Sequence, residues 1–501
     1  MNVTIFSPYA TVVPHFETEL DIAQQHLDAG DRVEFFNCTG QLANCDFNPH
    51  REPERCQQCI GRRNMGFELL SSTASAPVQH QFEDHCPNPK KVPPADNSRR
   101  EELRTRFDSV DDLTNYRIDQ FDIGYAVLSS IVSICRDPEP DLVQHERLVE
   151  RFAITAFEAY FQTLDYLGRR QSENQPVDRA YVYNGRFAAM RAIFRACEKM
   201  KVDCFLHERG CDGQHYELLK NHLPHDLVMI EKAIRDRWEQ AASNPDRERI
   251  ASSWFHDRLN RVEKVWHSFV KDQQAGRLPS DFDTSRKNIS IFCSSDDEFV
   301  AIGKAWQNDL YPNQVVAIDL IARDLHQQQP ETQIYLRVHP NLKDVENQRL
   351  SDMLSLDHPN LTVIEPGAPI DTYALIRASD TVVSFGSSVG SEAVFWGKPS
   401  VLLGPCFYQN LGGVYRSHSH QQTIELLCST LDPQNKTGAL MYGHWFQTRG
   451  FKHKYFESTG LFEGTFKQQT LYAKPTHSPG KFKTFRRRAR RLFKSLTGAG
   501  S

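Results

Sequence analysis

No stretch of this sequence approaches the ~20 consecutive apolar residues that a helix needs to cross a bilayer. Residues 1–7 form a short β-like run without the basic start of a signal peptide, so export is not expected. The twelve cysteines are unevenly spaced along 501 residues, which argues against a disulfide framework. These absences favour a protein of a reducing cytoplasm.

Acidic residues are missing from the end of the chain. Residues 481–501 contain eight Lys or Arg and no Asp or Glu, although the whole chain carries a net charge of −5. The rest of the chain is therefore more acidic than the total suggests. An acidic body with a short basic tail argues against a general nucleic-acid-binding protein.

Two series of alternating strand and helix patterns predict an α/β fold class. The length suggests two or three domains at ~150 residues each. We expect two Rossmann-like parallel-sheet domains facing a cleft, residues 1–280 and 286–450. Within the first we expect a cysteine-containing insertion at 38–66 and a long loop at 71–100. A polar connecting segment, 451–480, and a basic tail, 481–501, follow.

Two segments about fifty residues apart carry most of the chemical information. Arg337-Val-His339-Pro follows a β-rich run at 333–336, and Ser384-Phe-Gly386-Ser387-Ser388 follows another at 380–383. The carboxyl end of a strand is where open α/β sheets bind ligands. The second segment also opens a predicted helix, where unpaired backbone N–H groups favour an anion. Together the two segments predict a phosphate site.

The run from Arg337-x-His339-Pro through Gly386, Ser387, Ser388 and Glu392 resembles the C-terminal domain of GT-B glycosyltransferases, over residues 286–431. It is most similar to the bacterial capsule polysaccharide synthesis group, and more distantly to CDP-glycerol glycerophosphotransferases and GT-B sialyltransferases. The fold implied is GT-B-like, with a C-terminal amphipathic helix added by the tail.

The resemblance implies a nucleotide-sugar donor held by the second half. His339 would donate a hydrogen bond to a phosphate or act as acid to the leaving nucleotide. Arg337 would add charge-assisted bonds, with the alternative that alternation along the strand points it away from the ligand. Gly386, Ser387 and Ser388 would form the phosphate loop, and Glu392 would accept hydrogen bonds from the ribose. No DxD-like acidic pair occurs at a suitable position, so no catalytic cofactor is expected.

The first half would hold the acceptor and a general base. Tyr183-Asn184-Gly-Arg186 and His207-Glu208-Arg-Gly each follow a predicted strand. Glu208 is the favoured base, although a structural ion pair with a neighbouring arginine would explain it equally well. Asn184 and Arg186 would contact the acceptor or the donor phosphate, or would form a helix-starting turn. Other candidate bases are His15, His207, Asp297 and Glu298.

Four cysteines fall within 22 residues: Cys38, Cys45, Cys56 and Cys59. The C-x2-C pair suits tetrahedral thiolate coordination, and four thiolates would close a structural zinc site. The wide first spacing leaves four unlinked cysteines as the alternative. We expect zinc ahead of an iron–sulfur cluster, in a structural role.

The tail, KFKTFRRRARRLFKSL, places apolar residues at three- and four-residue steps among eight basic ones. This pattern is typical of an interfacial amphipathic helix, which would hold residues 481–496 on an anionic membrane surface. A disordered basic arm is the alternative.

We therefore expect a bacterial glycosyltransferase that lies peripherally on the cytoplasmic face of the inner membrane. It would move a sugar from a nucleotide-sugar donor to a surface or capsular polysaccharide acceptor, which could be lipid-linked, and it would bind no nucleic acid. Two alternatives stay open: a CDP-glycerol-type phosphopolyol transferase, and a non-catalytic membrane-tethered subunit of a polysaccharide assembly complex.

Overall fold

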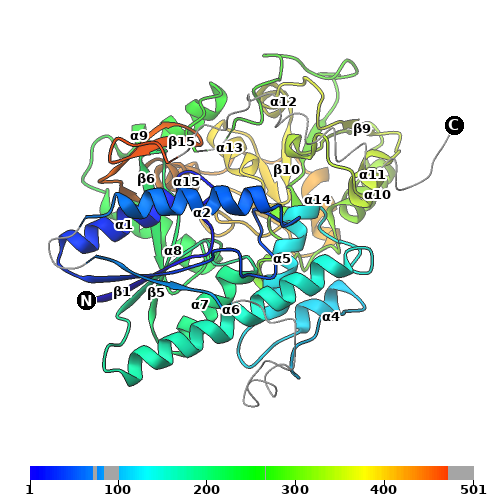
Figure 1. Ribbon diagram of the computed structural model, residues 1–501. Coiled ribbons are helices and arrows are strands. Elements are labelled where there is room, and N and C mark those ends of the chain that lie inside the picture. The colour runs from blue at the N-terminus through cyan, green and yellow to red at the C-terminus, as the bar shows by residue number, and fades with distance from the viewer. Residues whose placement is uncertain (72–75, 84–100, 266, 472–501) are drawn as a thin grey trace.

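The computed structural model describes residues 1–71, 76–83, 101–265 and 267–471 (Figure 1). The expected tail helix, at 481–496, lies outside the described residues. None of the helices in the described part of the chain combines the length and the apolarity that crossing a bilayer requires.

The first half is built on a seven-stranded sheet with the order β13-β6-β5-β4-β1-β2-β3. Its strands and helices are β1 (Asn2–Ser7), α1 (His15–Asp28), β2 (Arg32–Asn37), α2 (Pro53–Glu68), β3 (Val78–Gln81), α4 (Val110–Asn115), α5 (Ile123–Cys135), α6 (Glu146–Ser172), β4 (Arg179–Tyr183), α7 (Ala188–Lys199), β5 (Asp203–Arg209), β6 (His215–Lys220), α8 (Leu227–Gln240) and α9 (Arg247–Leu259).

The second half has a six-stranded parallel sheet with the order β12-β11-β10-β7-β8-β9. Its elements are β7 (Asn288–Phe292), the 3-10 turns η2 (Asp296–Glu298) and η3 (Lys304–Trp306), α10 (Gln314–Gln328), β8 (Gln333–Arg337), the 3-10 turn η4 (Pro340–Leu342), α11 (Gln348–Leu354), β9 (Leu361–Ile364), α12 (Thr372–Ala378), β10 (Thr381–Ser384), α13 (Val389–Phe395), β11 (Ser400–Leu402), β12 (Tyr415–Arg416) and α14 (His420–Cys428).

Both strand orders are those of Rossmann-like folds. In each sheet the first three strands run outward in one direction and the fourth pairs with the first on its other side. The switch points lie between β1 and β4 and between β7 and β10. The predicted fold class, α/β with two Rossmann-like parallel-sheet halves, is confirmed.

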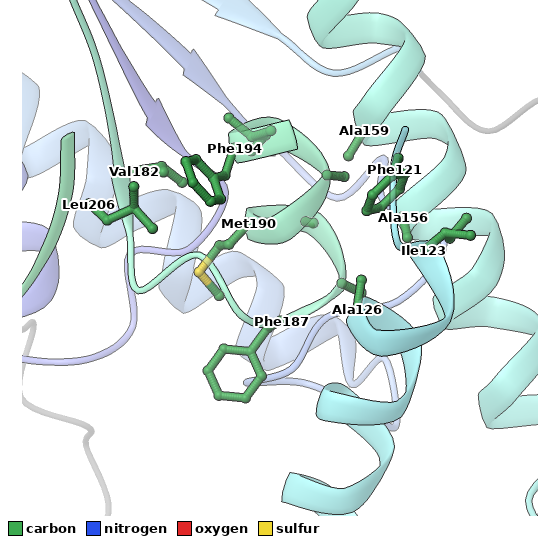
Figure 2. Close-up of a cluster of buried hydrophobic side chains, with 14 of the residues drawn as sticks. Phe121, Ile123, Ala126, Ala156, Ala159, Val182, Phe187, Met190, Phe194 and Leu206 are labelled. Carbon is green, nitrogen blue, oxygen red and sulfur yellow. The ribbon is translucent and has the colours of Figure 1, made fainter. Parts of the chain in front are cut away.

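Helices cover both faces of the first sheet, as parallel sheets require. Alternate residues of β1 point to opposite faces: Ile5 packs toward α1 and α2, and Phe6 toward α5, α6 and α7. Figure 1 shows α1 and α2 along one side of the sheet and α6 and α7 along the other. Figure 2 shows the second of these layers, where Val182 and Leu206 of the sheet face Met190 and Phe194 of α7.

After the second sheet the chain returns to the first half through α15 (Thr437–Thr448), β13 (Phe451–Lys452) and the hairpin β14 (Phe456–Gly460) and β15 (Glu463–Phe466). β13 pairs with β6, and the buried carboxylate of Asp21 on α1 accepts backbone hydrogen bonds from Lys454, Tyr455 and Phe456. The sequence predicts only a polar connection over 451–480. Strand β13 forms there because β6 of the first half supplies its partner, whereas β14 and β15 pair with each other.

Three other local expectations differ from the structure. The alternation of strand and helix patterns predicts a helix after strand β7, and the structure has only short 3-10 turns there, at 296–298 and 304–306. The loop expected at 71–100 contains edge strand β3, which pairs with β2. The insertion expected to be irregular at 38–66 includes most of α2, and Pro53 at its first position suits a helix start.

Candidate functional site

The carboxyl ends of the two sheets meet along a polar contact between the halves. Arg186, which follows β4, donates from Nη1 to the carbonyl of Glu298, which follows β7, at 2.7 Å. Arg136, at the end of α5, forms an ion pair with the buried carboxylate of Asp297. Asn341 donates from Nδ2 to Oε1 of Glu298 at 2.9 Å. The loops that were predicted to carry chemistry in each half are therefore neighbours.

His339 lies at the carboxyl end of β8 and is partly buried. Its Nδ1 accepts a hydrogen bond from the backbone N–H of Asn341 at 3.1 Å, and its ring meets Phe269 edge-on at 5.2 Å. Burial lowers the pKa of His339 to about 4, so the ring is neutral near pH 7. With Nδ1 accepting, the proton of a neutral ring sits on Nε2, which is left as a donor.

Arg337 faces a different environment from His339. Its side chain is buried, and it donates to the carbonyls of Glu365 and Ala368 in the loop after β9. Burial lowers its pKa to about 10. These contacts stabilise the loop between β9 and α12, and they support the alternative that strand alternation points Arg337 away from the ligand. Its donor-binding role stays a prediction.

The loop from Ser384 to Ser388 makes a tight turn into α13. Gly386 has φ of +108°, and a Cβ there would lie 2.5 Å from the carbonyl oxygen of Pro405. A Cβ at Gly390 would lie 2.3 Å from the hydroxyl of Tyr408. These close approaches explain the small residues. Helix α13 has seven residues, so its dipole contributes little to anion binding.

Positive charge at this loop comes from Arg258, at the end of α9. Arg258 donates from Nη2 to Oγ of Ser388 at 3.0 Å and from Nε to Oε1 of Glu392 at 2.9 Å. Ser388 also donates to Oε1 of Glu392, and Tyr373 donates to Oε2 at 2.6 Å. Glu392 is 1% exposed. In this structure Glu392 holds Arg258 against Ser388, and its ribose-binding role stays a prediction.

In the first half, Asn184 and Glu208 contact each other at the ends of β4 and β5. Asn184 donates from Nδ2 to Oε2 of Glu208 at 2.7 Å, and the backbone N–H of Arg209 donates to Oε1 at 3.0 Å. The guanidinium of Arg209 donates to the carbonyls of Val13, Val265 and Leu461. Glu208 is thus held by neutral donors at the edge that faces the second half, and its role as base stays a prediction.

A cavity of about 370 Å³ lies at the switch point of the second sheet. Ligand sites commonly have ~300–1,000 Å³. Residues from both halves line it, and burial raises the pKa of Asp296 in its wall to about 6. His339 and Ser388 are not in this wall. The lining includes Pro138, Glu139, Ser294, Asp296, Phe385 and Gly386.

All four clustered cysteines line one smaller cavity of about 40 Å³, beside the end of β1. Cys38 follows β2, Cys45 lies in the next loop, and Cys56 and Cys59 lie one turn apart on α2. The structure thus brings the four cysteines to one cavity, and their role as metal ligands stays a prediction.

Sequence reasoning missed Arg258, Tyr373 and Arg136. Arg258 and Glu392 are 134 residues apart in the chain, and Arg136 and Asp297 are 161 apart. No local sequence pattern marks any of the three, because the role of each depends on a hydrogen-bond partner in another element. Only a resemblance that extended over α9 could have identified Arg258.

No family model and no curated protein matches this chain. Its solved structural neighbours include glycosyltransferases. A KpsC β-Kdo 2,4-transferase of Thermosulfurimonas dismutans has 11% identity and a TM-score of 0.37, over 53% of this chain and 79% of that chain. A KpsC β-Kdo 2,7-transferase of the same organism has 15% identity and a TM-score of 0.32, over 57% and 80%.

The spinosyn rhamnosyltransferase SpnG, solved with spinosyn aglycone, has 14% identity and a TM-score of 0.25, over 89% of this chain and 96% of that chain. These TM-scores are too low for the likenesses to carry an argument. The fold therefore rests on the strand orders, and the chemistry on the side chains.

Proposed function

We propose that this protein is a glycosyltransferase that moves a sugar from a nucleotide-sugar donor to a glycan acceptor. One observation carries the proposal: a neutral histidine and an arginine–serine pair lie at the carboxyl edge of a Rossmann-ordered sheet, and a carboxylate lies at a strand end of the other half. This is the edge where such sheets bind nucleotides.

The donor phosphates would bind between His339 and the Ser388–Arg258 pair. Nε2–H of His339 donates to a phosphate oxygen, and the free face of Arg258 neutralises its charge. A bound phosphate raises the pKa of the His339 ring above about 4, since a nearby anion favours the imidazolium. His339 can then stabilise negative charge on the departing nucleotide by hydrogen bonding or by proton transfer.

Glu208 is the base we propose for the acceptor. It lies at the carboxyl end of β5 in the first half, and Asn184 orients it through a single hydrogen bond that leaves lone pairs on both carboxylate oxygens. Deprotonation of the acceptor hydroxyl by Glu208 and stabilisation of the leaving nucleotide by His339 would be complementary steps in one cleft. Arg186, which donates to the carbonyl of Glu298, links the first half to the second beside these side chains.

We further propose that the acceptor is a growing surface or capsular glycan, carried near an anionic membrane by residues 481–496. Support for this comes from the basic and apolar pattern of that segment, which lies beyond the described residues. A glycan on a lipid carrier would be held close to the cleft by such an anchor.

The test uses the full chain with a panel of UDP-, GDP-, CDP- and CMP-sugars, and measures released nucleotide with and without glycan acceptors. We expect one donor class to be turned over, and His339→Ala to reduce the rate by ~100-fold or more. His418→Ala, which changes an exposed histidine, is the matched control and should match wild type. Absence of binding and turnover with every donor would contradict the proposal.

A further inference from the structure

The four cysteines that line the cavity beside β1 are suited to a particular kind of metal group. We propose that Cys38, Cys45, Cys56 and Cys59 bind an iron–sulfur cluster of the [4Fe–4S] type rather than a single zinc ion. Clusters of this type take four cysteine thiolates. The inference is independent of the proposed transferase activity.

Sulfur spacing separates the two kinds of group. A Zn–S bond of about 2.3 Å limits any two sulfurs on one zinc to about 4.6 Å, whatever the coordination angle. Within the described part of the chain, no three of the four cysteine sulfurs lie within 4.8 Å of one another. They nevertheless surround one cavity. With the side chains placed as they are here, a group of several irons and sulfides can bond to all four sulfurs. A single zinc ion cannot bond to three of them at once.

Hydrogen-bond donors already point at three of the sulfurs. The backbone N–H of Gly40 donates to Sγ of Cys38, and that of Ala10 donates to Sγ of Cys59, both at 3.3 Å. Nδ2 of Asn48 donates to Sγ of Cys56 at 3.3 Å. Such bonds stabilise thiolate ligands and tune cluster potentials.

A buried amide in the cavity wall lacks a partner. Asn44 has no exposed surface, and neither atom of its side-chain amide makes a hydrogen bond within the described residues. An unpaired buried amide costs free energy, so its presence needs an explanation. An inorganic sulfide or a thiolate in the cavity would accept from its N–H group.

The charges around the cavity suit an anionic group. Four thiolates give a bound cluster net negative charge, and Arg51 and Arg55 line the cavity. Arg63 donates toward Sγ of Cys59 at 3.8 Å. On binding, each cysteine replaces a terminal ligand of a preformed cluster: its sulfur bonds the iron, the bond from that iron to the earlier ligand breaks, and the thiol proton goes to the departing ligand or to solvent, so no oxidant is required. The group would connect the turn after β1 to α2, a structural role.

The first measurement is the composition of the full chain purified without oxygen. We expect about four irons and about four sulfides per chain, with a broad visible absorbance that dithionite bleaches. One zinc per chain in a colourless protein would overturn the proposal, and so would a folded protein that contains neither iron nor zinc.

Variants then locate the group. Cys45→Ser and Cys56→Ser should each lose most of the iron and sulfide. Cys428→Ser changes a partly exposed cysteine far along the chain, and should retain both. If a cysteine variant does not fold, the iron, sulfide and zinc content of the wild-type protein still distinguishes the cluster from a zinc ion. Equal iron content in Cys45→Ser and Cys428→Ser would overturn the assignment of these ligands.

Discussion

At the scale of single residues, His339 combines a fixed tautomer with a neutral charge. The N–H of Asn341 holds Nδ1 as an acceptor, and burial lowers the pKa of the ring to about 4. A neutral ring with its proton on Nε2 can donate one hydrogen bond to a phosphate oxygen. The same burial makes protonation of His339 unfavourable to the folded state.

This unfavourable protonation predicts a pH dependence of stability. The pKa of His339 is about 4 when folded and 6.5 for the ordinary side chain, so the unfolded chain binds more protons between these values. The free energy of unfolding therefore falls as pH drops from about 6.5 to about 4, by up to about 3 kcal/mol from this residue. Urea unfolding at about pH 7 and about pH 5 should show a smaller fall in His339→Gln than in wild type.

The exposed histidine variant His418→Gln is the control, and should keep the pH dependence of wild type. An equal fall in wild type and His339→Gln would contradict the assigned burial.

Asn184 is suited to its position both by its backbone conformation and by the hydrogen bonds of its side chain. Its φ is +56°, in the left-handed region that asparagine tolerates better than alanine, and its amide holds Glu208 and the N–H of Arg186. Asn184→Ala should lower the free energy of unfolding by ~1–2 kcal/mol. Asn184→Gly should cost less, because glycine keeps the backbone conformation. Equal losses in urea unfolding would show that the backbone conformation contributes nothing.

At the scale of elements, α5 and α7 are joined by a buried charge cluster. Asp122 accepts from Arg191 at 2.6 Å and from Arg195 at 2.8 Å, and Arg191 also donates to the carbonyl of Ile302 in the second half. Burial alone would raise the pKa of Asp122, but the two arginines hold it below its usual range. One carboxylate thus links two helices and the opposite half.

Asp122→Asn should lower the free energy of unfolding by ~3–5 kcal/mol, because it leaves buried arginine charge with less compensation. A carboxylate with a depressed pKa stabilises the fold above its ordinary pKa, so the difference from wild type should shrink as pH falls below about 4. Asp119→Asn removes the same charge from an exposed pair with Lys199 and should change little. Similar effects of both variants on the urea midpoint would contradict the cluster's role.

Elements with strong periodicity could be predicted from the sequence, and those that depend on distant partners could not. The buried strands β7, β8, β10 and β11 have short sequences rich in β-branched, aromatic and other apolar residues, so their positions and the ligand-binding edge were predictable. Strand β3 has an exposed, polar sequence and pairs with the distant strand β2, and β14 and β15 pair only with each other, in a hairpin packed near α1. Likewise His339 and Ser388 could be predicted because strand ends mark them, whereas Arg258 reaches the site from α9.

At the scale of the whole molecule, the two halves are bound together by many contacts. Arg349 pairs with Glu139 at 2.5 Å, and Nε1 of Trp306 donates to the carbonyl of His225 at 2.8 Å. Helix α15 packs against α8 and α9 of the first half. An anionic membrane surface is the further partner that we propose for this molecule.

The basic segment 481–496 is the one that we expect to make that contact. Full-length protein should sediment with vesicles of anionic lipid and be released by salt, since each basic residue contributes up to ~1 kcal/mol near such a surface. Deletion of 481–501 should abolish sedimentation and leave donor turnover in solution unchanged. Neutral vesicles are the control, and binding by the truncated protein would contradict this model.

The pairing of β13 with β6 has a consequence for how the protein is made. The first sheet begins at Asn2, but its edge strand is residues 451–452. A ribosome adding ~5–20 residues per second needs tens of seconds between β6 and β13. During that interval the nascent chain exposes the unpaired edge of β6. It also exposes the surface around Asp21, which is covered only when residues 454–456 have been made. Chaperones that protect strand edges would find their substrate in this half-finished first domain, well before the second domain is complete.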